Sequence, residues 1–397
     1  MAFPLRVLLV EDHAFQRRLG LRMLADLGVK APLEALDGPS ALALLEGDGE
    51  PVDIVLVDLD LPGMDGIELI RRIAERRCAR AVAVVSAMDA SVQHTIALMA
   101  RAAGLRMLGC IEKPMTADRL RELLQAFSAI EAVAAENDSD IQPHERIADA
   151  IAAGEVLPYF QPQVEMRNGR VVAVEALARW RRSGGRVLTA AQFIGRVEQQ
   201  GATAALFERT LSESARHWRT WQSRGIDLRI SVNLSAADLA DAAAADRIEH
   251  LVRQYGMPPD RVILELTESS AITDRVVGLG LLARLRLKGF GLSIDDFGTG
   301  YSSLAQLTQL PFTELKVDRS FVSGIERMPK NRATVAASID LARRLGLDVV
   351  GEGVERSEEW ATLAELGCTM AQGWLVSPAV PGEDIPAVIA RWASVQG

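Results

Sequence analysis

The sequence predicts an α/β protein of two domains, a doubly wound parallel sheet followed by a (β/α)8 barrel. At 397 residues the chain is too long for one average domain. Short apolar runs alternate with amphipathic, helix-like segments along most of its length. Several of these runs end in a carboxylate, an amide or a lysine, which is expected where parallel strands carry a site at their carboxyl edge.

The composition is that of a globular protein, with 49% hydrophobic and 24% charged residues. The cysteines, Cys78, Cys110 and Cys368, lack metal-ligand spacing, which fits a reducing compartment and argues against a disulfide framework. The net charge of −9 argues against DNA binding. No apolar run approaches the roughly 18 residues of a membrane-spanning helix, and the N-terminus lacks the features of a signal peptide. We therefore expect a cytoplasmic protein without membrane insertion.

The first domain begins with four strand-like apolar runs at residues 5–12, 51–60, 79–88 and 107–114, separated by helix-like segments. Continuous apolar strands indicate a parallel sheet that is covered by helices on both faces. Polar residues fall at the carboxyl ends of these strands, where a doubly wound sheet carries its site. They are Glu11, Asp12, Asp58, Ser86 and Lys113.

The residue types in this cluster suit only a few kinds of chemistry. Three carboxylates beside one lysine form an oxygen-rich pocket that suits Mg²⁺. A carboxylate beside a metal and a cation can also accept a phosphoryl group. Each acid alone could be an ordinary loop residue, whereas the set together favours a site.

The stretches VLLVED, VDLDLPGMDG, VVSA and EKP resemble the motifs of response-regulator receiver domains, which have a flavodoxin-like fold. The resemblance implies that Glu11 and Asp12 hold Mg²⁺ together with Asp58. It implies further that Asp58 accepts phosphate from a sensor histidine kinase, and that Ser86 and Lys113 contact the phosphoryl group.

The first domain departs from the receiver pattern at Cys110, which stands three residues before Lys113, where the family usually has an aromatic switch residue. The departure does not affect phosphate acceptance. It leaves open how the signal is passed on.

The boundary between the domains is expected near the loop signal NDSDIQP at 137–143. The segment HERIADAIAAGE then predicts a short amphipathic helix that opens the next unit. We assign 1–130 to the receiver domain, 131–146 to a linker and 147–397 to the second domain. The helix before the loop could act as a coupling element.

In the second domain, about 250 residues of alternating strand-like and helix-like segments predict a (β/α)8 barrel. Polar residues at the carboxyl ends of barrel strands share one mouth, so an acid such as Glu175 becomes one wall of an acidic cup. The residues predicted there are Glu175, Asn233, Glu265, Asp295, Asp296, Lys316, Asp318 and Glu352.

The acids of this cup indicate a metal site. Glu175, Glu265, Asp295 and Glu352 would repel one another around Asn233 unless divalent cations compensate their charge. Oxygen ligands favour Mg²⁺ or Mn²⁺ over zinc. Two such cations can activate a water and stabilise both oxygens of an in-line displacement, which predicts metal-assisted phosphodiester hydrolysis.

Two basic residues complete this prediction. Arg179 would lie one helical turn beyond Glu175 if the strand leads into a helix, where it could hold a substrate phosphate. Lys316 is suited to orienting the attacking water or helping to deprotonate it.

The stretches FQP, EAL, SVNLS, LELTES, DDFGTGYSSL, LKVDRSF, GEGVE and QG follow one another in the order typical of EAL-domain phosphodiesterases, which are TIM-like barrels. The resemblance covers residues 147–393 and implies hydrolysis of cyclic di-GMP to linear pGpG, with two Mg²⁺ or Mn²⁺ ions per site. Together, the two domains resemble the RocR-like response regulators.

The EAL resemblance also assigns roles to single residues. It implies that the metal ligands are Glu175, Asn233, Glu265, Asp295, Asp296 and Glu352, and that Asp296 or Lys316 serves the nucleophilic water. The implied contacts with substrate or its surroundings are Gln161, Arg179, Asp318, Glu355 and Gln372. Glu268 matches the residue that steadies the glycine-containing loop 297–303, so Glu268→Ala is expected to lower activity by loosening that loop.

The second domain departs from the family pattern at Gly351, Trp374, Ser377, Pro378 and Ala379. These positions belong to the rim and the last strand, so they could alter substrate affinity. They remove no predicted metal ligand.

A non-enzymatic module that binds the dinucleotide or a partner without cleaving it is the alternative function. The complete set of acids favours the enzyme, because a binding module has no need of a self-repelling cup. A cyclase is disfavoured because the chain holds no GGDEF-like stretch. Because EAL and receiver domains both pair, a homodimer or higher oligomer is expected.

Overall fold

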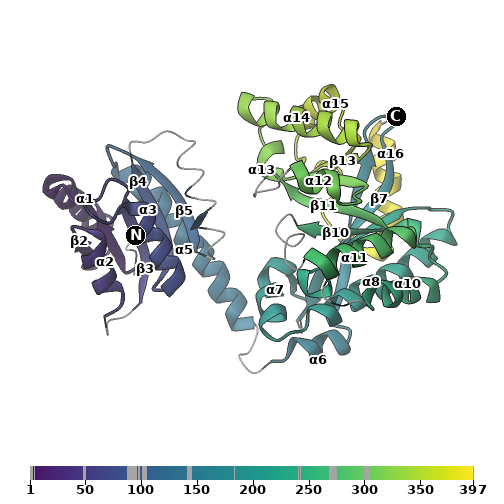
Figure 1. Cartoon of the computed structure of the whole chain (residues 1–397), viewed down its shortest axis with the longest axis horizontal. Helices are drawn as coiled ribbons and strands as arrows, with labels where there is room; N and C mark the ends of the chain where they lie inside the picture. Colours follow the sequence, from purple (N-terminus) through teal and green to yellow (C-terminus); the bar gives the residue numbers. More distant parts are fainter. Residues whose placement is uncertain are drawn as a thin grey trace. The chain divides into compact units, whose positions relative to one another are not determined.

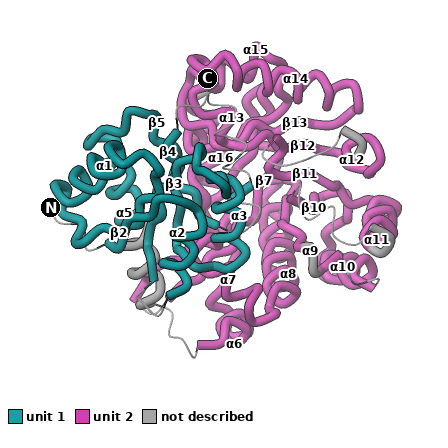
Figure 2. The backbone as a smooth tube through the Cα atoms, turned by 60° about the vertical axis from the view of Figure 1, so that its left-hand side comes forward, with its two compact units in different colours: residues 1–142 teal, residues 143–397 magenta. Residues whose placement is uncertain are grey.

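The computed structural model describes residues 3, 5–47, 51–86, 96, 99–100, 105–140, 145–182, 184–239, 241, 243–267, 275–298 and 304–396. The chain forms two compact units, residues 1–142 and 143–397 (Figure 2). Among the helices described, none combines the length and apolar character that crossing a membrane requires.

Unit 1 is built on a five-stranded parallel sheet with the strand order β2-β1-β3-β4-β5 (Figure 1). Its strands are β1 (Val7–Val10), β2 (Leu33–Ala35), β3 (Val52–Asp58), β4 (Ala79–Ser86) and β5 (Arg106–Glu112). Its helices include α1 (Ala14–Asp26), α2 (Gly38–Leu45), α3 (Gly66–Arg76) and α5 (Ala117–Asp140). This order is that of flavodoxin-like folds, so the predicted fold class is confirmed for this unit.

Helices cover both faces of this sheet. On one face, Val57 of β3 packs in the same apolar cluster as Ile70 of α3. On the other face, Leu56 shares a cluster with Leu24 of α1 and Phe127 of α5. Successive residues of β3 therefore pack against helices on opposite faces of the sheet, as the pleat of a strand requires.

Two local features of unit 1 differ from the sequence expectation. Strand β2 was not predicted, because three residues with an acid in the middle give no recognisable pattern. Helix α5 continues to Asp140 and so includes the first residues of the expected loop 137–143. Asparagine, aspartate and serine lower helix propensity by only about 0.7 kcal/mol per residue or less, which is too little to end an established helix.

Unit 2 is a barrel that closes through pairing of its first two strands, β6 and β7. The barrel strands among the described residues are β6 (Val156–Glu165), β7 (Arg170–Arg181), β9 (Arg229–Asn233), β10 (Val262–Thr267), β11 (Gly291–Phe297), β12 (Glu314–Val317), β13 (Asp348–Gly351) and β14 (Met370–Gln372). Two short strands, β8 (Val187–Thr189) and β15 (Val380–Pro381), extend the pairing at β7 and β6. The predicted eight-stranded barrel is thus confirmed.

Helices surround the barrel and connect its strands (Figure 1). They are α6 (Ile147–Ala152), α7 (Ala190–Gln199), α8 (Thr203–Gln222), α9 (Ala236–Leu239), α10 (Ala244–Gln254), α11 (Arg275–Leu287), α12 (Leu304–Gln309), α13 (Arg319–Val322), α14 (Pro329–Leu345), α15 (Ser357–Leu366) and α16 (Ile385–Gln396). Short 3₁₀ turns lie at Pro259–Arg261 and Gly382–Asp384. The α6 helix is the predicted one that opens the unit.

The first strand gives the barrel a feature that the sequence did not reveal. Strand β6 is antiparallel to both of its neighbours, β7 and β14, whereas the remaining barrel strands are parallel. It forms a hairpin with β7 through a turn in which Gly169 has a φ of 69°, a value that favours glycine. The residues of β6 and β7 that belong to the acidic cup, Gln161 and Glu175, therefore lie in the middle of these strands and not at their ends.

Candidate active site

Lys316 of β12 lies at the centre of the acidic cup, and its side chain is 1% exposed. Its Nζ atom is 2.7 Å from Glu352, 3.0 Å from Glu265, 3.3 Å from Asp295 and 3.4 Å from Glu175, measured to one carboxylate oxygen of each. The acids come from β7, β10, β11 and the residue after β13. The barrel thus brings four predicted acids and the predicted lysine together.

The charged groups of the cup shift one another's pKa values. Burial opposes the charged form of Lys316, but the surrounding carboxylates outweigh it and raise the lysine pKa well above its usual value. Burial raises the pKa of Glu265 well above its usual value and that of Glu352 to about 8, with neighbouring acids adding to both. Burial also opposes ionisation of Glu175, yet Lys316 and hydrogen bonding lower its pKa. One ammonium is therefore insufficient to keep every carboxylate of the cup ionised at neutral pH.

The donor set fits a hard divalent cation. Within the described part of the chain, Glu265 Oε1 is buried without a hydrogen-bond partner, an unfavourable state for a carboxylate oxygen. Asp295 Oδ1, also buried, has no hydrogen bond beyond its ion pair with Lys316 Nζ at 3.3 Å. Asp295, Asp296 and Glu352 can place one carboxylate oxygen each within 4.8 Å of the others. Carboxylate oxygens are the ligands that Mg²⁺ and similar cations prefer.

A break in the strand pattern brings Asp296 to the same place as Asp295. Neighbouring residues of a strand normally point to opposite faces. The register of β11 against β12 shifts between Ile294 and Phe297, and Asp296 has a φ of 56°. Such a bulge re-aims side chains. The pKa of Asp296 is raised to about 6 by burial and by the nearby charges of Asp295 and Asp318.

Glutamine side chains of the neighbouring strands β6 and β14 fix Glu175. Gln372, the last residue of β14, donates through Nε2 to Glu175 Oε2 and, at 3.1 Å, to Gln161 Oε1. Gln163 Nε2 donates in turn to Gln372 Oε1 at 2.9 Å. Gln163 is fully buried and was missed from the sequence, although its position two residues after Gln161 places both on one strand face.

A cavity of about 260 Å³ opens over the cup. It is lined by Gln161, Glu175, Leu177, Asp295, Arg319, Glu352, Gly353, Glu355, Gln372, Gly373 and Trp374. Glu355 is paired with Arg319, whose Nη2 lies 2.7 Å from Glu355 Oε1. Arg319 and Trp374 were not predicted as site residues, because their approach depends on loop conformations.

The remaining predicted residues lie around this cavity or beside its walls. Asn233 ends β9 and pairs in register with Glu265 of β10. Asp318 caps α13 by accepting a hydrogen bond from the Ser320 backbone at 2.9 Å. The condition stated for Arg179, a helix after Glu175, is not met, because β7 continues to Arg181. Arg179 instead shares the strand face of Glu175, and burial lowers its pKa.

Glu359 of α15 supports the wall that follows β13 and was also missed. Its side chain is 2% exposed, and it accepts hydrogen bonds from the backbone nitrogens of Gly324, Glu355 and Arg356. The Arg356 guanidinium pairs with Glu359 at 2.7 Å and with Glu326 at 2.8 Å. These contacts tie the loop that carries Glu355 to the loop after α13.

The departures from the family pattern have different surroundings. A methyl group at Gly351 would lie 2.7 Å from the Leu363 side chain, so glycine permits the packing of β13 on α15. Trp374 is 64% exposed at the rim of the cavity. Ser377 accepts a hydrogen bond through its carbonyl from Gln161 at 3.2 Å, while Pro378 and Ala379 precede β15. Glu268 and loop residues 299–303 lie outside the described residues.

The predicted receiver site is also assembled. Lys113 Nζ lies 2.6 Å from Asp58 Oδ2 and 3.0 Å from Glu11 Oε2. Burial opposes the charged lysine, but Asp58 and Glu11 outweigh it and raise its pKa. Glu11 and Asp58 are buried and Asp12 is exposed, and the three acids can place oxygens within 4.8 Å of one another, which suits a metal ion. Ser86 ends β4 and is buried, and its carbonyl accepts from the Lys113 backbone.

Cys110 lies in β5 opposite Val84 and is half-buried against the apolar cluster beneath α2 and α3. Burial raises the pKa of its thiol, which disfavours the thiolate. The side chain therefore acts as a small apolar group at this position.

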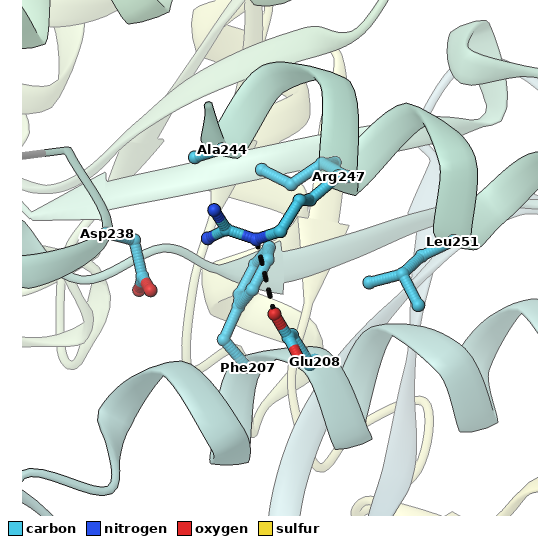
Figure 3. A pocket seen from close by; sticks show the side chains of 7 residues that line it. Phe207, Glu208, Asp238, Ala244, Arg247 and Leu251 are labelled. Carbon is cyan, nitrogen blue, oxygen red and sulfur yellow. Dashed lines mark ion pairs between the residues drawn. The ribbon is translucent and has the colours of Figure 1, made fainter. Parts of the chain in front are cut away.

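A further pocket, shown in Figure 3, lies between α8, α9 and α10 on the outside of the barrel. Arg247 reaches across it to Glu208, with Nε and Oε1 3.5 Å apart. The pocket has a volume of about 10 Å³, which is room for a single water. We assign no functional role to it.

The comparisons with known proteins identify both units. The EAL domain model matches residues 144–379, and the response regulator receiver domain model matches residues 7–125. The chain therefore belongs to the EAL-domain family, in a form that carries an N-terminal receiver domain.

Individual proteins resemble the chain over one or both units. The cyclic di-GMP phosphodiesterase RocR of Pseudomonas aeruginosa is 33% identical over 380 residues, which are 95% of this chain and 96% of RocR. The PaMucR phosphodiesterase in its c-di-GMP complex matches with a TM-score of 0.57 and 38% identity, over 60% of this chain and 97% of that one. An EAL-domain protein from Listeria monocytogenes EGD-e matches with a TM-score of 0.56 and 29% identity, over 62% of this chain and 97% of that one.

Proposed function

We propose that the barrel hydrolyses one phosphodiester bond of cyclic di-GMP and releases linear pGpG. The observation that carries this proposal is the position of Lys316 among four carboxylates, of which Glu265 retains a buried oxygen without a hydrogen-bond partner. The likeness to RocR, a cyclic di-GMP phosphodiesterase, extends over nearly the whole chain and supports the same substrate.

Two Mg²⁺ or Mn²⁺ ions per barrel are the proposed cofactors. Their ligands would come from Glu175, Asn233, Glu265, Asp295, Asp296 and Glu352. When bound, these cations lower the pKa of a water and neutralise charge on the phosphate oxygens. The unpartnered oxygen of Glu265 supports this assignment.

The side chains of the cup then serve the attacking water. Asp296 is the proposed base for one of its protons, because its carboxylate lies beside those of Asp295 and Glu352. Lys316 remains protonated, holds the carboxylates in place and orients the water, while Gln372 fixes Glu175. The water oxygen forms a bond to phosphorus, the P–O3′ bond breaks, and the 3′ oxygen leaves as a hydroxyl group after taking up a proton.

Residues around the cavity hold the substrate. Gln161, Glu355 and Gln372 line it directly. Arg179 and Asp318 are proposed contacts at its edges. The Arg179 guanidinium suits a phosphate.

The N-terminal domain is proposed to regulate the barrel. Asp58 accepts a phosphoryl group from a sensor histidine kinase, with Mg²⁺ held by Glu11, Asp12 and Asp58. Lys113 and Ser86 contact the transferred group. We assign residues 1–130 to this domain, 131–146 to the linker and 147–397 to the barrel domain, and propose a homodimer or higher oligomer. The cytoplasmic location stays a prediction.

The test is turnover of cyclic di-GMP by the purified chain in Mg²⁺ and in Mn²⁺, with chromatography of the products. Glu175→Gln is the blank, and Glu165→Gln, at the far end of β6, is the matched control. We expect pGpG from the wild type and the control only. Measurable binding without product from the wild type would contradict hydrolysis and favour a binding module.

A further inference from the structure

Gln163 of β6 is a fully buried polar side chain beneath the acidic cup, on the strand face that also carries Gln161. Its Nε2 atom donates to Gln372 Oε1 at 2.9 Å, whereas its own Oε1 atom has no hydrogen-bond partner among the described residues. A buried amide with an unpaired oxygen is unfavourable for folding. The residue type at this position therefore points to a role in the site and not in stability.

The pairing of the strands fixes where Gln163 lies. Strand β6 stands between β14 and β7 in the barrel. Gln163 pairs in register with Gln372 of β14, and Gln161 pairs in register with Glu175 of β7. The hydrogen bond that Gln372 donates to Glu175 therefore spans β6, beside the two glutamines of that strand.

The hydrogen bonds of these side chains run in one direction. The ionised carboxylate of Glu175 can only accept, so the amide of Gln372 must turn its Nε2 atom toward it. The Oε1 atom of Gln372 then faces away from Glu175 and needs a donor, which Gln163 Nε2 supplies. The opposite orientation of Gln372 would set its oxygen against the oxygens of Glu175.

Gln161 requires the same orientation of Gln372. Its Oε1 atom accepts from Gln372 Nε2 at 3.1 Å, and its own Nε2 atom donates to the carbonyl oxygen of Ser377 at 3.2 Å. A carbonyl oxygen only accepts, so the amide of Gln161 cannot be reversed without the loss of this bond. Gln372 is thus held by a donor on one side and by two acceptors on the other.

The orientation of Gln372 matters because of the atom that it holds. Gln372 and Lys316 both contact Oε2 of Glu175, and the Nζ atom of Lys316 lies 3.4 Å away. These two contacts orient the carboxylate and, with it, the Oε1 atom that Glu175 can offer to a cation. Without a donor at Gln372 Oε1, the amide of Gln372 loses one of the bonds that fix it.

We propose that Gln163 is a positioning residue for metal binding, which acts through Gln372 to orient the carboxylate of Glu175. The proposal rests on the proposed function, because it takes a divalent cation in the cup with Glu175 as one of its ligands. It gives the buried amide of Gln163 a function that filling the barrel interior does not require.

The test is the affinity for Mn²⁺, measured by electron paramagnetic resonance without substrate. We expect Gln163→Met to raise the Kd of the cup by roughly threefold to tenfold, the factor that corresponds to loss of one hydrogen bond. Glu175→Gln gives the contribution of the receiver site, which all the variants share. The control is Val164→Ala, which removes buried volume from a separate apolar cluster with Val376 and Trp392 and should leave this Kd unchanged.

A double-mutant cycle separates positioning from packing. If Gln163 acts through Gln372, Gln163→Met should change the Mn²⁺ Kd by less than about twofold in a Gln372→Met background. A packing role predicts the same change in both backgrounds. Urea unfolding of each metal-free variant establishes that it is folded, and Gln163→Leu is a second apolar replacement for the same cycle.

An unchanged Mn²⁺ Kd in Gln163→Met and Gln163→Leu, or equal changes in both backgrounds, would overturn the positioning role. The readout does not depend on catalysis. A wild type that binds Mn²⁺ more tightly than Gln163→Met but releases no pGpG would refute the proposed hydrolysis and support the role of Gln163.

Discussion

Nζ of Lys316 lies 2.7 Å from Oε1 of Glu352, and both side chains are largely buried at the mouth of the barrel. The two residues come from neighbouring strands, since β12 pairs with β13 and Glu352 directly follows β13. The contact places a cation beside an acid whose pKa is raised to about 8. Lys316 therefore compensates part of the negative charge that these acids bring together.

The first prediction concerns Lys316→Met. Removal of one partner from buried ion pairs costs about 3–5 kcal/mol, because the remaining charges lose their compensation. We expect the metal-stripped variant to have a lower free energy of unfolding than the wild type, and Mg²⁺ or Mn²⁺ to recover part of the loss. Hydrolysis should fall by at least about 100-fold.

The matched control is Lys288→Met, which removes a lysine that pairs with Asp246 and Glu249 at the surface. It should leave hydrolysis unchanged. Urea unfolding followed by tryptophan fluorescence reports on the barrel unit, because each tryptophan of the chain lies after residue 143. Equal stability of Lys316→Met and wild type without metal would contradict the role of Lys316.

The second prediction concerns pH. The pKa of Glu352 is about 8 in the folded protein and about 4.5 in its ordinary state. Between these values the unfolded chain releases a proton that the folded chain keeps, so the metal-free fold loses stability as pH rises. We expect the free energy of unfolding to fall between pH 5 and 8 by on the order of a few kcal/mol more in the wild type than in Glu352→Gln.

Urea titrations of both metal-stripped proteins across this range provide the measurement. The comparison removes contributions from groups that the two proteins share. A wild-type stability that rises with pH relative to Glu352→Gln would show the opposite sign and refute the assignment.

The third prediction concerns Asp58. Incubation with Mg²⁺ and a small phosphodonor such as acetyl phosphate should add one phosphoryl group per chain, because Lys113 and the acids around Asp58 can neutralise the transferred charge. Intact-mass spectrometry measures the gain. Asp58→Asn should abolish it, and Asp60→Asn, which changes a nearby exposed aspartate, should not. Equal labelling of Asp58→Asn would place the acceptor elsewhere.

The fourth prediction concerns Glu359. Its replacement by alanine leaves the backbone nitrogens of Gly324, Glu355 and Arg356 without their acceptor, so the loop beside the cup loosens. We expect Glu359→Ala to lower the free energy of unfolding by about 1–3 kcal/mol and to raise KM. Glu365→Ala, which removes an exposed acid of the same region, is the control. A KM equal to that of the control would exclude a positioning role.

The strand-end acids could be predicted from the sequence because parallel strands share one carboxyl edge, so Asp58 and Glu352 needed no tertiary information. The antiparallel course of β6 could not be predicted, because an apolar run does not indicate whether a strand pairs in a parallel or an antiparallel way. Arg179 was placed one helical turn beyond Glu175 on the condition that a helix follows, and β7 instead continues to Arg181. The hairpin closes the barrel and extends β7 beyond Glu175.

Other residues depend on contacts between segments that are distant in sequence. Arg319 at the start of α13 meets Glu355 of the loop after β13, and the glycine that permits this, Gly353, is recognisable only from its φ and its neighbours. Glu359 occupies the first turn of an ordinary amphipathic helix, so its bonds to the loop could not be foreseen. Gln163 could have been predicted, because it is two residues from Gln161 and shares its strand face, but it was overlooked.

The most direct test of the central claim is hydrolysis of cyclic di-GMP in water enriched in ¹⁸O, with mass spectrometry of the product. Water attack on phosphorus predicts pGpG with one ¹⁸O in its 5′-phosphate, formed by the wild type and not by Glu175→Gln. Product without ¹⁸O, or no product from protein that binds the dinucleotide and holds its metal, would contradict the account.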